Sequence, residues 1–211
     1  RTLINGNDTS YDEKLGILAD YNIPCARMSG CGFWAIDNDL YVNDKPEYFR
    51  RFDAVIASAE AHGVGLIPSL FWAYFTVPDI VGEPCNRWGQ PGSGTIAYMR
   101  DYVRDVVTRY KDSPAIWGWE CGNEWNLSAD LPNAADHRPP IWPTLGTPAF
   151  RSEEDDMTHE MIVYALAEIA KEIRKYDPDR MISSGNTDPR PSAWHQWQYL
   201  TWEADTPAQH A

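Results

Sequence analysis

Four segments of the chain place apolar residues every three or four positions, which is the pattern of an amphipathic helix. Residues that end helices follow three of them: Gly63 comes after the second segment, and Pro114 and Pro178 come after the third and fourth. The periodicity therefore predicts helices over residues 11–18, 48–59, 96–110 and 162–176.

Short apolar runs alternate with these helices, at residues 23–28, 64–70, 115–121 and 181–184. The runs are nearly continuous rather than alternating with polar residues, which indicates strands that are buried on both faces. Strands that alternate with helices predict right-handed crossovers and a parallel sheet, so the expected class is α/β.

The segments that follow the strands are long, at residues 29–46, 71–94, 122–157 and 185–211, whereas those from helix to strand are short. This asymmetry is typical of a barrel or an open sheet with its site at the carboxyl ends of the strands. The strands start near positions 23, 64, 115 and 180, about 52 residues apart, so eight such units would need about 416 residues. The 211 residues therefore predict about half of a barrel in one domain, residues 1–211, with no linker to a second domain.

Composition excludes several partners. The chain has 18 Lys and Arg against 31 Asp and Glu, a formal net charge of −13, which repels nucleic acids and anionic membrane surfaces. No apolar stretch is long enough to span a bilayer. Ten tryptophans and an aromatic content of 13% provide more ring faces than a core of this size needs, and such faces stack on sugars or flat ligands.

The four cysteines are too scattered for a metal site or a disulfide framework. Cys25 and Cys121 lie in apolar runs and are expected to be buried thiols. Cys31 and Cys85 leave two alternatives open, free thiols or a loop disulfide in a secreted protein. No metal and no cofactor is implied.

The segment from Trp119 to Asn126 carries the most informative chemistry, because an apolar strand ends there in Asn123-Glu124. If Trp119 and Trp125 flank the Glu124 carboxyl, they desolvate it in part, which favours the protonated form and suits a general acid. The amide of Asn123 can donate to a substrate hydroxyl. The alternative is that Asn-Glu only caps a turn.

This run, Trp119-Glu120-Cys121-Gly122-Asn123-Glu124-Trp125-Asn126, resembles the fourth-strand motif of clan A glycoside hydrolases, especially the cellulase-like family 5. The resemblance implies a (β/α)8 TIM barrel, present here as roughly its N-terminal half, and hydrolysis with retention by two Glu residues. It implies that Glu124 is the acid/base and that Asn123 binds the sugar 2-hydroxyl. The family's arginine near the nucleophile would be Arg27, which we expect to face the same cavity as Glu124.

The resemblance covers residues 11–190, about strands 2 to 5, with the first strand missing or reduced to residues 2–5. The family's nucleophile lies on the seventh strand, so we expect it outside this chain and expect the segment alone to be inactive. Glu203 is the one late glutamate in a promising setting, but too few strands separate it from Glu124. The rest of the barrel, or a second chain, is needed to close the sheet.

Three further side chains are assigned from their places beside the strand ends. Trp72 and Trp125 are the tryptophans expected to contact sugar, because they lie nearest those ends. Glu120 is expected to be a buried group paired with a cation.

The sequence thus predicts a retaining glycoside hydrolase acting on a β-linked polysaccharide or oligosaccharide, cellulase-like or mannanase-like, outside the cell or in the periplasm. One alternative is a non-catalytic carbohydrate-binding or scaffold fragment of a barrel. Another is a different parallel α/β enzyme in which Asn123-Glu124 is a coincidence.

Overall fold

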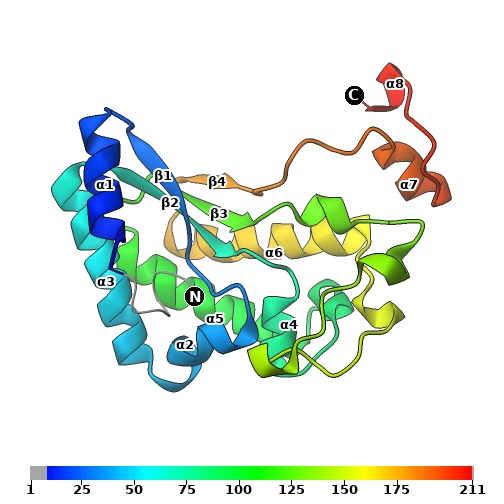
Figure 1. Cartoon of the computed structure of the whole chain (residues 1–211), viewed down its shortest axis with the longest axis horizontal. Coiled ribbons are helices and arrows are strands. Elements are labelled where there is room, and N and C mark those ends of the chain that lie inside the picture. Colours follow the sequence, from blue (N-terminus) through cyan, green and yellow to red (C-terminus); the bar gives the residue numbers. More distant parts are fainter. Residues whose placement is uncertain (1–8, 211) are drawn as a thin grey trace.

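A four-stranded parallel sheet forms the centre of the computed structural model, which describes residues 9–210 (Figure 1). The strands are β1 (Cys25–Ser29), β2 (Gly65–Phe71), β3 (Gly118–Gly122) and β4 (Met181–Ser183), and they pair in the order β1-β2-β3-β4. All three pairings are parallel, as the alternation of strands and helices predicts. The short first strand expected at residues 2–5 lies outside the described residues.

Four long helices connect and cover the strands: α1 (Tyr11–Asp20), α3 (Lys45–His62), α5 (Gly94–Tyr110) and α6 (His159–Tyr176). Side-chain caps set the starts of three of them, since Asp44, Ser93 and Thr158 accept hydrogen bonds from the first turns of α3, α5 and α6. Gly63 ends α3 with a left-handed conformation, φ 67°, that glycine adopts without a steric penalty. The predicted helices are therefore confirmed, each extended by a few residues.

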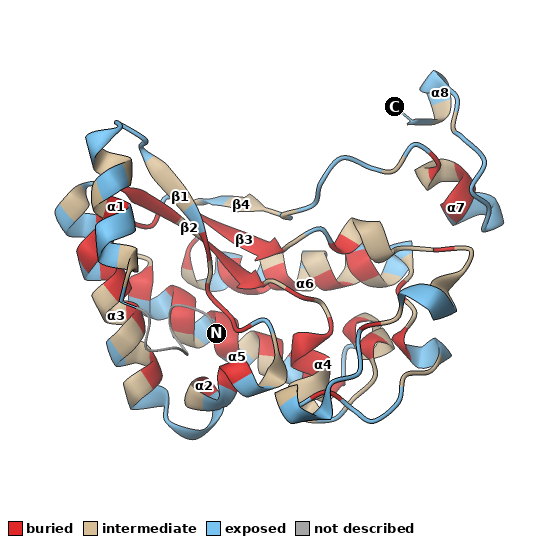
Figure 2. Cartoon of the chain, in the orientation of Figure 1, coloured by how far each residue is buried: buried red, intermediate tan, exposed pale blue. Residues whose placement is uncertain are grey.

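The core lies between the sheet and these helices, and α5 and α6 run beneath the strands (Figures 1 and 2). Leu66 and Leu70 of β2 point into it and are almost fully buried. The hydroxyls of Tyr48 on α3 and Tyr102 on α5 lie 2.8 Å apart, and both donate to the carbonyl of Gly30. These two bonds hold the carboxyl end of β1 against the helical layer.

The segments after the strands contain short elements that the sequence pattern does not predict. Four are α-helical: α2 (Asp39–Asn43), α4 (Thr76–Val81), α7 (Ala193–Tyr199) and α8 (Pro207–His210). Six are 3-10 helices: η1 (Ala35–Asn38), η2 (Cys85–Gly89), η3 (Trp125–Ser128), η4 (Ala134–His137), η5 (Pro143–Leu145) and η6 (Glu153–Asp155). None spans more than two turns, which is too short for a helical repeat to be recognised.

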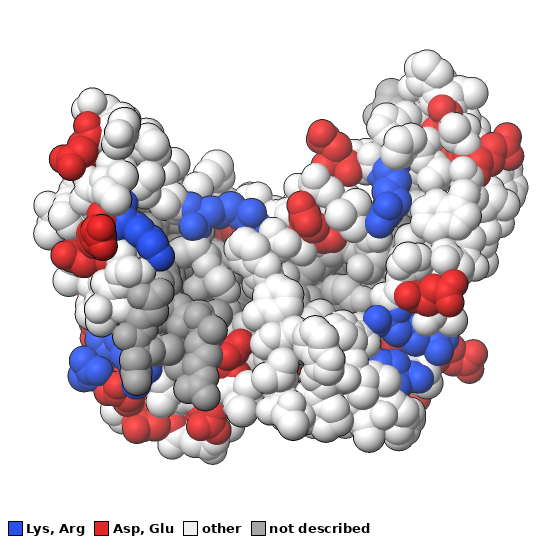
Figure 3. All heavy atoms as spheres, in the orientation of Figure 1, with Lys and Arg blue, Asp and Glu red and all other residues white. Residues whose placement is uncertain are grey.

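The second face of the sheet is not covered by any helix or strand of residues 9–210. Figure 3 shows the molecule hollowed between the end that carries α1 and the segment that carries α7 and α8, with charged side chains of both signs around the hollow. Trp117, beside β3, remains 48% exposed although its ring lies where a Cβ on Gly65 of β2 would be. Within the described residues, β1 and β4 each have one neighbour in the sheet, so both outer edges are unpaired.

No helix among residues 9–210 combines the length and the apolar character required to cross a membrane.

Candidate active site

The register of the sheet brings Arg27 and Glu120 to the same face. Arg27 pairs with Ile67, Glu120 pairs with Ser69, and residues two apart in a strand point to the same side. This is the face opposite Leu66 and Leu70, so both charged groups lie on the side that the helices leave open.

Arg27 and Glu120 form a two-pronged ion pair. Arg27 Nε lies 2.9 and 2.7 Å from the two carboxylate oxygens of Glu120, and Arg27 Nη2 donates to Oε1 at 2.6 Å. The Glu120 side chain is 6% exposed, whereas that of Arg27 is 41% exposed. The cation expected for the buried Glu120 is therefore Arg27, and the planar guanidinium is held in a fixed orientation.

The same guanidinium orients Asn123 at the end of β3. Arg27 Nη2 donates to Asn123 Oδ1 at 2.8 Å, so the amide nitrogen of Asn123 is directed away from Arg27 as a donor. The ring of Trp72, which follows β2, lies under the guanidinium with its centre 4.7 Å from Arg27 Cζ. The structure thus brings together three of the predicted site residues, Arg27, Trp72 and Asn123, with Glu120 beneath them.

Glu124 follows directly and has an unusual backbone. It adopts φ 54° and ψ 30°, the left-handed region that side chains other than glycine seldom occupy. Its N–H donates to the carbonyl of Gly185 at 2.9 Å, which ties this turn to the segment after β4. A residue held in such a conformation is a reason to suspect function, because strain of this kind accumulates at active sites.

The surroundings of the Glu124 carboxyl differ from the expectation. Glu124 is exposed, and its carboxyl makes no hydrogen bond or ion pair with a side chain of residues 9–210. Trp119 is fully buried, and its indole N–H donates to Asp177 at 2.8 Å, so it does not flank the carboxyl. The predicted desolvation by two tryptophans is therefore wrong for this structure.

The structure also contradicts the prediction that Trp125 contacts sugar. It is 1% exposed, its indole N–H donates to the carbonyl of Phe71 at 3.1 Å, and its ring centre lies 5.0 Å from that of Trp88. The left-handed turn at Glu124 directs the next side chain into the core. In this structure Trp125 packs the end of β3 against the end of β2 and presents no ring face to solvent.

Gly185 is a site residue that sequence reasoning missed. Its φ is +73°, and a Cβ placed on it would lie 1.8 Å from the carbonyl oxygen of Gly122. Only glycine permits this close approach of two backbones at the ends of β3 and β4. A glycine just after a short strand is the signal that could have indicated it.

The cysteines and Glu203 take no part in this cluster. All four cysteines are free, so the Cys31–Cys85 disulfide is not formed. Burial raises the pKa of Cys31 and of Cys121 to about 12, which makes both thiols poor nucleophiles. Glu203 lies between α7 and α8 with its side chain 74% exposed, 3.7 Å from His195.

Among residues 9–210, no three His, Cys, Asp or Glu side chains are placed to hold a metal ion.

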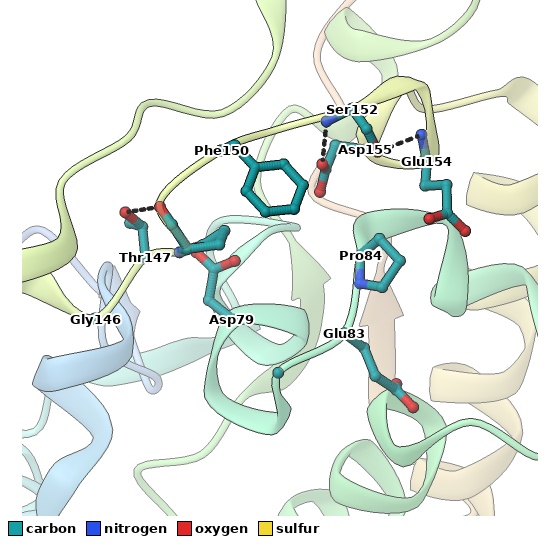
Figure 4. Close-up of a pocket in the computed structure, with 11 residues that line it drawn as sticks. Asp79, Glu83, Pro84, Gly146, Thr147, Phe150, Ser152, Glu154 and Asp155 are labelled. Atoms are coloured by element: carbon teal, nitrogen blue, oxygen red, sulfur yellow. Dashed lines mark hydrogen bonds between the residues drawn. The ribbon is translucent and has the colours of Figure 1, made fainter.

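A pocket of about 310 Å³ lies apart from this cluster, between α4 and residues 146–155. Figure 4 shows Phe150 and Pro84 on opposite sides of it. Asp79, which lines it, pairs with Arg151 at 2.7 and 2.8 Å, and both side chains are almost completely buried. Burial raises the pKa of Asp79, although Arg151 opposes that effect. Arg151 also forms an ion pair with Asp155. We interpret the buried ion pairs of Arg151 as the contacts that hold the long segment after β3 against α4.

Comparison with known proteins gives the cluster a context. No protein-family model matches the sequence. Over 187 residues, 83% of this chain, it is 28% identical to a probable mannan endo-1,4-beta-mannosidase C from Aspergillus terreus. Its fold is similar to that of the endo-beta-1,4-mannanase from Thermotoga petrophila, with a TM-score of 0.61 and 14% sequence identity over 88% of this chain. A family 1 b-glucosidase from Thermotoga maritima gives a TM-score of 0.55 at 14% identity, over 82% of this chain and 36% of that one.

These similarities confirm the resemblance to clan A glycoside hydrolases, and they identify the sheet as part of a TIM barrel. The chain spans 41% of the length of the Aspergillus terreus relative and 41% of the Thermotoga petrophila mannanase. The strands β1 to β4 are accordingly a partial barrel.

Proposed function

We propose that this chain forms the N-terminal part of the barrel of a retaining glycoside hydrolase of the mannanase type, acting on a β-linked polysaccharide. The observation that carries the proposal is the cluster at the ends of β1 and β3. There Glu124 extends into solvent beside Asn123, and Asn123 is oriented by Arg27. The names of the sequence relative and of the structural neighbour, both mannan-degrading enzymes, support the choice of substrate class.

Glu124 is the general acid and base in this proposal. In the first step its protonated carboxyl gives a proton to the glycosidic oxygen while a second carboxylate attacks the anomeric carbon. In the second step the Glu124 carboxylate takes a proton from the water that releases the sugar. An exposed carboxyl without a competing partner is free to approach a substrate oxygen in both steps.

Asn123, Arg27 and Trp72 bind the sugar next to the scissile bond. The amide N–H of Asn123 donates to a sugar hydroxyl, since its oxygen is already occupied by Arg27. The guanidinium provides positive charge where the second carboxylate must sit. Trp72 is half-buried, and its ring lies under the guanidinium.

The second carboxylate is expected outside this chain. Retention requires two carboxyl groups about 5–5.5 Å apart, and the chain spans less than half of its relative. The rest of the barrel is therefore the necessary partner of this segment. Because the relevant substrates are polymers too large to enter a cell, we place the enzyme outside the cell or in the periplasm.

The direct test is Glu124→Gln in the complete protein, assayed on aryl β-mannosides with poor and good leaving groups. Loss of the acid should slow cleavage of the poor leaving group by about 10²–10⁴-fold. The defect should be far smaller for a good leaving group, which departs without protonation. The matched control is Glu154→Gln, at an exposed glutamate outside this cluster, and it should leave both cleavage rates unchanged. An equal defect on both substrates would show that Glu124 is not the acid.

A second test concerns the segment by itself. Residues 1–211 should not turn over an activated β-glycoside, because we expect the second carboxylate to lie outside this chain. Turnover that Glu203→Ala abolishes would instead make Glu203 the nucleophile. Sugar binding by the complete protein without any turnover would favour the other candidate, a non-catalytic carbohydrate-binding barrel.

A further inference from the structure

The hydrogen bonds between β3 and β4 continue beyond the carboxyl ends of the two strands. The N–H of Gly122 donates to the carbonyl of Ser184 at 3.2 Å, and the N–H of Glu124 donates to the carbonyl of Gly185 at 2.9 Å. These bonds join the turn that carries Glu124 to residues 184–190, which follow β4 and which we term the β4 extension. The position of Glu124 therefore depends on a segment from another part of the chain.

The backbone pairing stops at Glu124, and the side chain of Asn126 takes its place. After Glu124 the chain enters η3, and within the described residues no further backbone–backbone hydrogen bond joins it to the β4 extension. Instead Asn126 Nδ2 donates to the carbonyl of Thr187 at 2.9 Å, and Asn126 Oδ1 accepts from the N–H of Thr187 at 3.3 Å. Because a side-chain amide has the donor and the acceptor of a peptide group, Asn126 extends the ladder by one further step.

The neighbours of Asn126 are held by other means. The indole N–H of Trp125 donates to the carbonyl of Phe71 after β2, and the carbonyl of Leu127 accepts from Arg190 Nη2 at 3.2 Å. Among the described side chains of residues 123–128, only that of Asn126 forms a hydrogen bond with the β4 extension. The two bonds of Asn126 are thus the part of this link that a substitution in the turn can remove without altering the backbone.

The conformation of Glu124 requires such a link. Its φ of 54° is unfavourable for a residue with a Cβ, and such a backbone persists only where the surrounding structure enforces it. The exposed carboxyl has no side-chain partner within residues 9–210, so the backbone alone determines where it lies. A general acid must lie within hydrogen-bond reach of the oxygen that it protonates, and a displacement of about 1 Å can slow a reaction about 10²-fold.

We infer that Asn126 is a positioning residue for Glu124. Its amide anchors the turn to the β4 extension and thereby keeps the Glu124 carboxyl where it gives its proton to the glycosidic oxygen. The inference rests on the proposed function for the role of Glu124 as the acid. Asn126 itself transfers no proton, because both polar atoms of its side chain bind the backbone of Thr187.

The experiment is Asn126→Ala in the complete protein, with kcat/KM measured on aryl β-mannosides that have poor and good leaving groups. This ratio reports the first step of the reaction, in which only a poor leaving group needs the proton of Glu124. For the poor leaving group kcat/KM should fall about tenfold or more, because the acid is displaced. For the good leaving group it should change less than about twofold. A general loss of structure would lower both values together.

Two controls isolate the contact. Thr187→Ala changes the partner residue but keeps the backbone N–H and carbonyl that bind Asn126, so both values of kcat/KM should equal those of the parent. Ser93→Ala removes the cap of α5, which makes no hydrogen bond with residues 122–127, so it should lower stability without changing the ratio of the two values. Hydrogen exchange at the amides of Glu124 and Thr187 should be faster in Asn126→Ala and unchanged in Ser93→Ala.

The outcomes separate this inference from the proposed function. Equal losses on both substrates in Asn126→Ala, or no loss on either, would overturn the positioning role of Asn126. If Glu124→Gln depends on the leaving group and Asn126→Ala does not, only this inference is overturned. If Glu124→Gln itself shows no such dependence, the proposed acid is overturned as well.

Discussion

Replacing Arg27 by methionine is expected to destabilise the protein more than replacing its partner, Glu120, by glutamine. The reason is the unequal burial of the pair, since Glu120 is 6% exposed and Arg27 41% exposed. Within residues 9–210, Arg27 supplies all three hydrogen bonds that the Glu120 carboxylate accepts. Arg27→Met therefore leaves a buried charge without a partner, whereas Glu120→Gln leaves a cation that water can reach.

The magnitudes follow from that asymmetry. Removing one partner of a buried ion pair costs about 3–5 kcal/mol of stability. Because this pair lies on the open face of the sheet, where water can reach it, we expect Arg27→Met to cost about 3 kcal/mol, near the lower end of that range. Glu120→Gln keeps one oxygen to accept from Arg27, and the exposed guanidinium is screened, so its cost should be about 1 kcal/mol. For a domain of this size these costs correspond to falls in Tm of about 6–12 °C and 2–4 °C.

Urea and thermal unfolding of the two variants, and of the double variant, would measure these differences. The double variant removes both charges, so it should recover about 2 kcal/mol of the loss caused by Arg27→Met. Glu154→Gln is the control, because its partner Arg87 lies 3.4 Å away at the surface and such pairs contribute less than about 1 kcal/mol. If Glu120→Gln were as damaging as Arg27→Met, or if the double variant recovered nothing, the argument from unequal burial would be refuted.

Three further predictions concern the backbone, pH and the thiols. Gly185→Ala should lower the free energy of unfolding in urea by about 2 kcal/mol or more, because the new Cβ would lie 1.8 Å from the Gly122 carbonyl oxygen at a φ of +73°. Gly92→Ala, at a position with open space around it, is the control, and equal stability of the two variants would contradict the prediction. Hydrogen bonds from Arg50 and Arg51 lower the pKa of Glu47 to about 2, below the 4.5 of an unperturbed Glu, so its contribution to stability is present above pH 4.5 and is lost as the pH falls towards 2. Between these pH values the Tm of Glu47→Gln should fall less steeply than that of the parent, and identical slopes would refute the lowered pKa of Glu47. A thiol reagent at neutral pH should label half-buried Cys25 first, because the other three cysteines are buried and have raised pKa values: Cys31, Cys85 and Cys121. Fast labelling of more than one cysteine would contradict this prediction.

The long elements were predictable because each repeats its pattern often enough. Helices of 10–18 residues contain several copies of the 3.6-residue period, and the apolar strands between them are too short to be helices. By contrast α4 and α7 have six and seven residues and lie in segments whose packing is decided by distant contacts. One such contact is the buried pair of Arg151 and Asp79, separated by 72 positions, which no local pattern reveals.

Part of the candidate site was predictable for a related reason. The regular alternation of a strand determines which side chains share a face, and this brings Arg27 to Glu120 without any knowledge of the loops. Asn123 lies one residue beyond β3, so the alternation does not place it. The same alternation explains the error at Trp119, because a side chain next to Glu120 in a strand must point to the opposite face, into the helical core. Trp125 could not be placed in this way, because the left-handed turn at Glu124 breaks the alternation just before it.

The exposure of Glu124 has a physical explanation in the open sheet. The face that carries Arg27 and Glu120 lacks a cover within residues 9–210, the edges of β1 and β4 are unpaired, and Glu124 follows the end of β3. A barrel closed by further strands would pair those edges and remove water from this face. Loss of water disfavours the charged form of a carboxyl, and an opposing carboxylate would add to that effect. If Glu124 is the acid, as we propose, the conditions it requires would therefore come from such closing strands rather than from the tryptophans beside it in the sequence.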